Sequence, residues 1–178
     1  MSTLQVQTLQ GPTSGADSNT IRVADGHTLV GGQGSIIQEQ ITVFPLVFTN
    51  TSTAYLQTGM EVAITPKLAS SKIVVTSVFN MNFTSTNGTY GFGAALYNLN
   101  TALIIGDGAN GDGIFYSSGP WAAGQGHLQF VVRAVDDQTN NTGLITYGLA
   151  IKNSSTTSEM SLSSNWGTNT ITATEIAQ

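Results

Sequence analysis

The sequence KIVVTSVF at residues 72–79 is the strongest strand signal in the chain, and it decides the fold class. Five of its eight residues are Ile, Val or Phe, which suit a pleated and buried surface. The continuous apolar run at residues 73–75 predicts burial on both faces of the strand. The next residues, NMNFT at 80–84, alternate polar and apolar side chains, so we expect one long strand from residue 72 to residue 84.

Further strands are predicted on both sides of this segment, separated by turn residues at spacings of about 8–12 positions. They cover residues 36–48, 59–66, 92–99, 102–105, 127–135, 142–152, 159–163 and 170–176. In the first of them, Pro45 predicts a bulge or a sheet edge. Together these segments predict an all-β fold, an eight- to nine-stranded antiparallel β-sandwich. Periodicity alone does not separate a sandwich from a barrel, but eight strands with long crossing loops fit a jelly roll.

Two of these strands show the clearest alternation of side chains between two faces. Residues 59–66 place Met60, Val62 and Ile64 on one face. Residues 127–135 place Leu128, Phe130, Val132 and Ala134 on one face. The opposite set is His127, Gln129, Val131 and Arg133.

Turn signals between the strands predict how neighbours connect. Asn87-Gly88 is a tight-turn pair and predicts a hairpin between the flanking strands. A second hairpin is expected across residues 98–101, and a long loop over residues 117–126. Asp136 and Asp137 are expected to be turn residues at the end of their strand.

The composition excludes several classes of function. Charged residues make up 8% of the 178 residues, which is too few to coat the outer faces of long helices. Five Lys and Arg residues at a net charge of −5 do not suit nucleic-acid binding. The absence of Cys excludes disulfides, thiolate zinc sites and thiol nucleophiles. No apolar run suggests membrane insertion and no secretory signal is recognised, so we expect synthesis in a cytoplasm.

Residues 1–35 differ from the remainder of the chain. Short alternating strands at residues 3–8 and 20–24 are separated by turn residues, and GGQG at 31–34 forms a flexible joint. Sizeable apolar residues are too few here to bury a core alone. Either a flexible tail or an extended arm ordered by other chains fits this pattern, and the regular strands favour the arm. We therefore divide the chain into an extended β arm, residues 1–35, and a β-sandwich domain, residues 36–178.

A glycine-rich segment, GDGANG at residues 106–111, matches the spacing of a dinucleotide-binding turn. A turn and a strand follow it instead of the helix that such a site requires, so nucleotide binding is not expected. Asp107, Asn110 and Asp112 could supply oxygen ligands to calcium, but an EF-hand loop also needs a downstream Glu. An inter-strand loop with solvated acids is the preferred interpretation.

No catalytic, cofactor-binding or metal-binding residue is predicted. Asp136 and Asp137 are neighbours on an extended chain and point to opposite faces, which argues against a glycosidase pair. His27 and His127 are the only histidines, and no motif ties either to a nucleophile. Ion binding by His27 on a symmetry axis is a weaker hypothesis. Trp121, Trp166 and Tyr116 are candidate interface or ligand aromatics, for subunit packing or for stacking on a glycan.

Four stretches resemble structural proteins of tailed bacteriophages, especially those of aquatic bacteria and cyanobacteria. LQVQTLQGPTSGADSNTIRV at residues 4–23 resembles a segment common in those proteins, and DGHTL at 25–29 resembles its usual continuation. YLQTGMEVAITPK at 55–67, followed by SSKIVV at 70–75, resembles a second phage pattern, which opens a β-sandwich. TITATEIAQ at 170–178 resembles the last strand of that domain.

The resemblance implies a virion protein: a tail fibre, an appendage or a capsid decoration, commonly a homotrimer and without shared catalytic residues. Three arms around one axis would bury the apolar arm residues Leu4, Val6, Ile21, Val23 and Leu29. We therefore expect a non-enzymatic, trimeric short fibre or appendage on the virion, bound to other virion proteins through its arm. A capsid decoration (cement) protein and a host-glycan-binding module are the alternatives.

Overall fold

The computed structural model describes most of the chain after residue 32. The described ranges are 33–45, 47–85, 89–105, 115–120, 124–137, 141–153, 158–162 and 167–178. The chain divides into residues 1–30 and residues 31–178, and the fold described below belongs to the second unit. Within the described ranges there are eleven strands and no helix.

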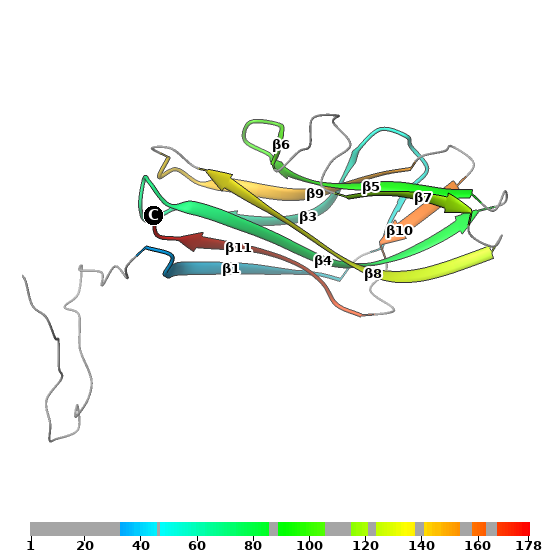
Figure 1. Cartoon of the computed structure of the whole chain (residues 1–178), viewed down its shortest axis with the longest axis horizontal. Helices are drawn as coiled ribbons and strands as arrows, with labels where there is room; N and C mark the ends of the chain where they lie inside the picture. The colour runs from blue at the N-terminus through cyan, green and yellow to red at the C-terminus, as the bar shows by residue number, and fades with distance from the viewer. Residues whose placement is uncertain are drawn as a thin grey trace, which may run out of the picture. The chain divides into compact units, whose positions relative to one another are not determined.

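The strands form two antiparallel sheets that lie on one another as two layers (Figure 1). The first sheet contains β1 (Ile36–Phe44), β2 (Phe48–Asn50), β4 (Lys72–Ser85), β8 (Gly124–Asp137), β10 (Ser158–Leu162) and β11 (Asn169–Ile176). The second contains β3 (Leu56–Ile64), β5 (Thr89–Asn98), β6 (Leu103–Ile105), β7 (Phe115–Pro120) and β9 (Ile145–Asn153). The predicted all-β antiparallel sandwich is therefore confirmed.

Three pairs of strands are continuations of one another, which reduces the eleven strands to eight paths. β10 and β11 pair with successive parts of β4, and β1 and β2 pair with β11 and β10. β6 and β7 pair with successive parts of β5. Numbered in chain order, the eight paths are β1–β2, β3, β4, β5, β6–β7, β8, β9 and β10–β11. Across the first sheet the order of paths is one, eight, three, six, and across the second it is two, seven, four, five. This order is a long hairpin of paired strands rolled into a sandwich, the jelly roll that eight strands predicted.

The interruptions in two paths of the first sheet lie side by side. Leu162 pairs with Met81 and Thr170 pairs with Val78, so seven residues of one path separate pairs that only two residues separate on β4. The side chain of Asn169 bridges this gap, because its Oδ1 accepts a hydrogen bond from the Asn80 backbone N–H at 2.7 Å. Pro45 falls in the matching interruption between β1 and β2, on the edge path of the sheet, as the sequence predicted.

Side chains from both sheets meet in a single core. Met60, Val62 and Ile64, which alternate along one face of β3, are all buried. The rings of Phe79 and Phe92 both pack against Phe130, with centroids 5.8 and 4.8 Å away. The alternation predicted for β8 is confirmed, although Leu128 remains 38% exposed near the end of the described core.

Three expectations about connections are wrong. The hairpin predicted at Asn87-Gly88 does not form, because β4 and β5 lie in different sheets and β4 pairs with β8. Much of the loop predicted at residues 117–126 is strand, since β7 runs to Pro120 and β8 begins at Gly124. Asp136 and Asp137 are strand residues of β8 and do not form a turn. The hairpin predicted across residues 98–101 is confirmed by the pairing of Asn98 with Leu103.

Candidate interaction surface

The side of the first sheet that faces away from the core carries an ordered set of side chains. Along β4, Ile73, Val75 and Phe79 point into the core, so the alternate residues point outward. The same alternation holds on the neighbouring strands. We call the resulting surface the outer face of the first sheet; it consists of Glu39, Ile41 and Val43 on β1, Thr170, Thr172 and Thr174 on β11, Lys72, Val74, Thr76 and Val78 on β4, and Val131, Arg133, Val135 and Asp137 on β8.

The strand register arranges these side chains in rows across the sheet, each crossing β8, β4, β11 and β1 in that order. The first row is Val131, Val78, Thr170 and Val43. The second row is Arg133, Thr76, Thr172 and Ile41. The third row is Val135, Val74, Thr174 and Glu39. Because directly opposite residues in a sheet touch, these rows form a continuous surface of Val, Ile and Thr.

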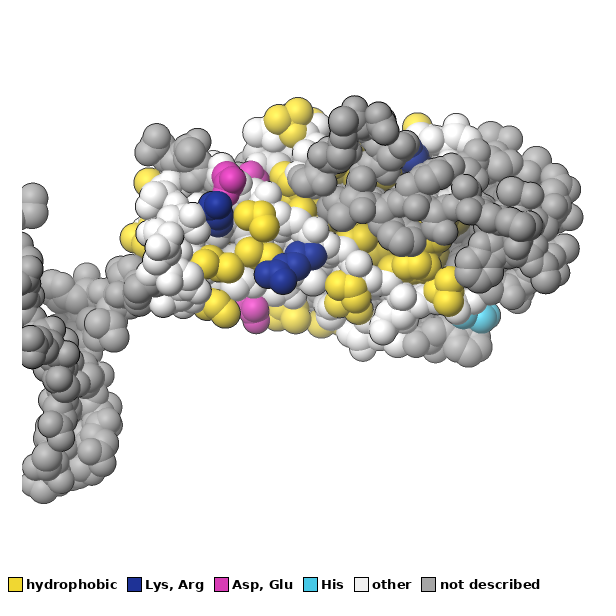
Figure 2. Space-filling view, in the orientation of Figure 1, with side chains coloured by type: hydrophobic (Ala, Val, Ile, Leu, Met, Phe, Trp, Pro, Cys, Tyr) yellow, Lys and Arg dark blue, Asp and Glu magenta, His cyan; other side chains and the backbone are white. Residues whose placement is uncertain are grey.

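Several apolar members of this face are open to solvent. Val131 is 63% exposed, Ile41 62%, Val43 55% and Val135 48%. Single exposed aliphatic residues are common on protein surfaces, but contiguous ones mark interaction sites. Figure 2 shows hydrophobic side chains lying beside isolated charged ones on one side of the molecule. The outer face of the first sheet is therefore our candidate interaction surface.

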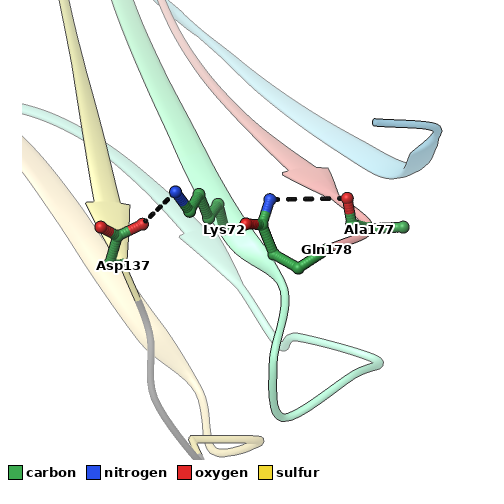
Figure 3. A network of polar contacts seen from close by, with 4 residues as sticks. All are labelled: Lys72, Asp137, Ala177 and Gln178. Carbon is green, nitrogen blue, oxygen red and sulfur yellow. Dashed lines mark hydrogen bonds and ion pairs between the residues drawn. The ribbon is translucent and has the colours of Figure 1, made fainter. Parts of the chain in front are cut away.

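The few charges on this face are spread across it. Lys72 and Asp137 form a salt bridge of 3.1 Å between β4 and β8, at one end of the sheet near Ala177 and Gln178 (Figure 3). Glu39 of β1 accepts a hydrogen bond of 3.0 Å from the Thr174 hydroxyl on β11. Arg133 lies at the β8 edge, whereas Glu39 lies at the β1 edge and one row away. Three inter-strand spacings, about 14 Å, separate these two edges, so the opposite charges do not meet within one copy.

Asp136 and Asp137 point to opposite faces of β8, as predicted. Asp136 faces inward, where its Oδ2 accepts hydrogen bonds from the Tyr147 hydroxyl at 2.9 Å and from the Asn98 amide at 3.1 Å. Asp137 faces outward and binds Lys72. The two carboxylates therefore do not converge on one substrate bond, as a glycosidase pair must.

One surface cleft lies beside Asp136. Its volume is about 470 Å³, and the turn between β5 and β6 lines much of it. Its lining residues include Asn98, Asn100, Thr101, Leu103 and Ile104. The amide of Asn100 is occupied by the Leu144 carbonyl and the Thr146 backbone N–H. The cleft thus offers amides and aliphatic side chains, but its two carboxylates already hold internal partners.

Another cleft has a volume of about 290 Å³ and lies beside His127 on β8. Asn80, Met81, Leu128 and Gln129 complete its described lining. His127 is exposed and opposite Asn82 of β4. These described residues do not place a nucleophile or a carboxylate in the cleft with the imidazole.

Glu175 of β11 is a buried carboxylate that the sequence interpretation missed. It is 0% exposed, and its oxygens accept hydrogen bonds from the Lys67 and Leu68 backbone N–H groups, the Ser71 hydroxyl and the Gln38 amide, all at 2.7–2.9 Å. Burial alone would raise the pKa of Glu175, but these hydrogen bonds together lower it below its ordinary value of 4.5. The alternation of Ile171, Ala173 and Glu175 could have predicted that this acid faces the core.

Glu175 also joins two segments that are far apart in the sequence. The turn after Thr65 belongs to the stretch at residues 55–75, and β11 belongs to the stretch at residues 169–178. The carboxylate ties this turn to β11, and Gln38 of β1 binds both the Thr65 carbonyl and Glu175. These two stretches thus form one structural unit.

Most of the site residues predicted from the sequence lie outside the described residues. These are Leu4, Val6, Ile21, Val23, Leu29, His27, Asp107, Asn110, Asp112, Trp121 and Trp166. Tyr116 lies on β7, where the strand register sets it opposite Gly93 of β5. The hydroxyl of Tyr55 covers Gly93, so closely that a Cβ at this position would lie 2.6 Å from it. Tyr55 also packs edge-on against Tyr97, with ring centroids 6.3 Å apart, and under the Lys152 ammonium.

Metal sites, membrane-spanning helices and similar proteins are the remaining indicators of function. In the described part of the chain, three or more His, Asp or Glu side chains nowhere gather as a metal site would require. The described residues also contain no helix with the length and apolar character to cross a membrane. No protein-family model matches the sequence, and a search of curated proteins found none that is significantly similar.

Proposed function

We propose that this protein is a non-enzymatic structural component of a tailed-bacteriophage virion. In this proposal it forms a trimeric short fibre or surface appendage, anchored by residues 1–35, with the jelly roll directed outward. The phage-like stretches at both ends and in the middle of the sequence support this assignment. The contact of the middle stretch with the C-terminal one through Glu175 supports treating these two as parts of one domain.

The observation that carries the proposal is the outer face of the first sheet. Its exposed Val and Ile residues lie on the two edge strands β1 and β8, and mainly Val and Thr residues of β4 and β11 lie between them. This surface carries few charges, which suits packing against further protein. A net charge of −5 spread over 178 residues also leaves little repulsion between copies on one axis. A self-assembling structural role explains both features.

The polar clusters favour a structural role over an enzymatic one. Asp136 accepts hydrogen bonds from Tyr147 and Asn98, and Asp137 forms a salt bridge with Lys72. Glu175 accepts hydrogen bonds from the turn between β3 and β4. Each of these three acids therefore has an internal partner in the fold. Depolymerase activity on host polysaccharide would contradict the proposal.

Deletion of residues 1–30 tests the anchoring role of the arm. We expect the shortened chain to keep its sandwich, because the described strands begin at Ile36, but to lose attachment to virions. Co-sedimentation with purified phage particles measures attachment, and circular dichroism checks the fold. Unchanged co-sedimentation of the shortened chain would show that the arm is not the anchor.

The two alternatives differ in partner. A capsid decoration protein would bind the capsid surface through the same arm, and electron microscopy of labelled particles distinguishes capsid from tail. A glycan-binding module would use its aromatic residues or the cleft near Asn100 to bind a host sugar. A glycan array, with Trp121→Ala compared with the natural protein, tests this second alternative.

A further inference from the structure

We infer that the outer face of the first sheet packs against the same face of further copies of this chain, with β8 of one copy against β1 of the next. This inference rests on the proposed trimer and names the surface that holds it together. The occupant is a second copy because the face is complementary to itself, both in its charges and in the apolar side chains along its two edges.

The charges support this pairing. Arg133 stands at the β8 edge and Glu39 at the β1 edge, one row apart along the strands. A rotation axis parallel to the strands preserves the height of each row, so it brings the β8 edge of one copy beside the β1 edge of the next. Arg133 of one copy then lies diagonally across from Glu39 of another, within the reach of a long side chain. Self-complementarity of this kind is what a symmetric assembly requires.

The apolar side chains support the same arrangement. Val131 and Val43 end the first row at the two edges and are 63% and 55% exposed. In the proposed arrangement they meet at equal height, next to the Arg133–Glu39 contact. β-branched residues on pleated faces pack well between sheets, so the pairing would remove these two exposed apolar side chains from water.

The size of the face sets the strength of the contact. Four strands and about seven residues along each give a face of roughly 20 by 23 Å, or about 450 Å² per copy. Two copies would bury about 900 Å², close to the lower limit of about 1,000 Å² for specific interfaces. The face alone therefore supports a weak, concentration-dependent contact, and the proposed winding of residues 1–35 adds to it.

An engineered disulfide tests the pairing directly. The chain contains no Cys, so Val43→Cys with Val131→Cys introduces the only two thiols. Within one copy these positions are about 14 Å apart, beyond the ~7 Å Cα separation that a disulfide spans. We expect oxidation of the full-length double variant to link different copies. Because a threefold axis closes the ring, the largest linked product should contain three chains.

The control variants and outcomes separate the inference from the proposed function. Each single-Cys variant should remain unlinked, and self-linking of Val131→Cys would overturn the inference by placing β8 against β8. Light scattering of the natural protein reports the trimer independently. A trimer whose double-Cys variant does not link would overturn the inference and leave the proposed function standing. If the largest disulfide-linked product contained two chains, the contact between β8 and β1 would be supported and the trimer would be contradicted.

Charge reversal gives a second test that does not depend on oxidation. We expect Arg133→Glu or Glu39→Arg alone to weaken assembly roughly tenfold, and the two together to restore it. Glu61→Arg, an exposed change on β3 of the other sheet, is the matched control and should leave assembly unchanged. If the losses of assembly in the two single variants simply added up in the double variant, the predicted Arg133–Glu39 contact would be overturned.

Discussion

Glu175 shows how one buried charge organises this end of the sandwich. A carboxylate without exposed surface is costly unless donors surround it, and here four groups from β1, the turn at residues 67–68 and Ser71 supply them. The backbone N–H groups of Lys67 and Leu68 would otherwise end in a turn without strand partners. The acid therefore fixes the turn between β3 and β4 against the last strand.

Replacement of this acid should be costly and dependent on pH. We expect Glu175→Gln to lower the free energy of unfolding by about 2–4 kcal/mol at pH 7, because the amide places an NH₂ group against backbone donors. Since the folded-state pKa lies below 4.5, the stabilisation is present above pH 4.5 and is lost as the pH falls through the folded-state pKa. Urea unfolding of both proteins between pH 7 and pH 2.5 measures the difference.

The matched control for this prediction is Glu61→Gln, which removes an exposed acid from β3 of the other sheet. We expect it to change the free energy of unfolding by less than about 0.5 kcal/mol, because exposed polar contacts contribute little. An equal effect of the two substitutions, or a Glu175 effect that does not shrink in acid, would contradict the role given to the buried carboxylate.

At the scale of elements, β3 is bent by an irregularity at Gly59. Its pairing with β9 shifts register between Gln57 and Glu61, and Gly59 adopts a φ of +78° in the middle of the strand. Glycine adopts this left-handed conformation without strain, whereas a Cβ makes it unfavourable. Space is not the constraint, because the nearest atom to a Cβ here would be Phe44 Cε2 at 3.8 Å.

Two substitutions at this position separate conformation from packing. We expect Gly59→Ala to lower the free energy of unfolding by about 1–2 kcal/mol, and Gly59→Asn to cost less because Asn tolerates positive φ. Thermal unfolding of the two variants measures the order. If Asn proved worse than Ala, side-chain volume rather than φ would explain the loss.

The sequence predicted where the strands lie better than which strands pair. Alternation in Met60, Val62 and Ile64 reports which face is buried, and this depends only on local geometry. It contains no information on the neighbouring strand, so Asn87-Gly88 suggested a hairpin where the chain crosses between sheets. The sequence correctly placed Val131 and Arg133 on one face of β8. Their place in rows that end at Val43 and Ile41 could not be predicted without the strand order.

At the scale of the molecule, the jelly roll explains how a chain with so little charge can remain a defined fold. Rolling one long hairpin buries an aliphatic and aromatic core between two sheets and leaves Thr-rich outer strands that need few charges. Both faces of β4 carry apolar residues, and only the inner one packs into the core. The exposed Val and Ile side chains on the outer face are therefore the feature that a monomer does not explain.

The central claim is that this chain works as an assembly of copies of itself. Multi-angle light scattering of the full-length protein at micromolar concentration tests it most directly. We predict a mass three times the 18.6 kDa of one chain, falling on dilution in the Arg133→Glu variant. A mass of one chain that does not rise with concentration would contradict the account.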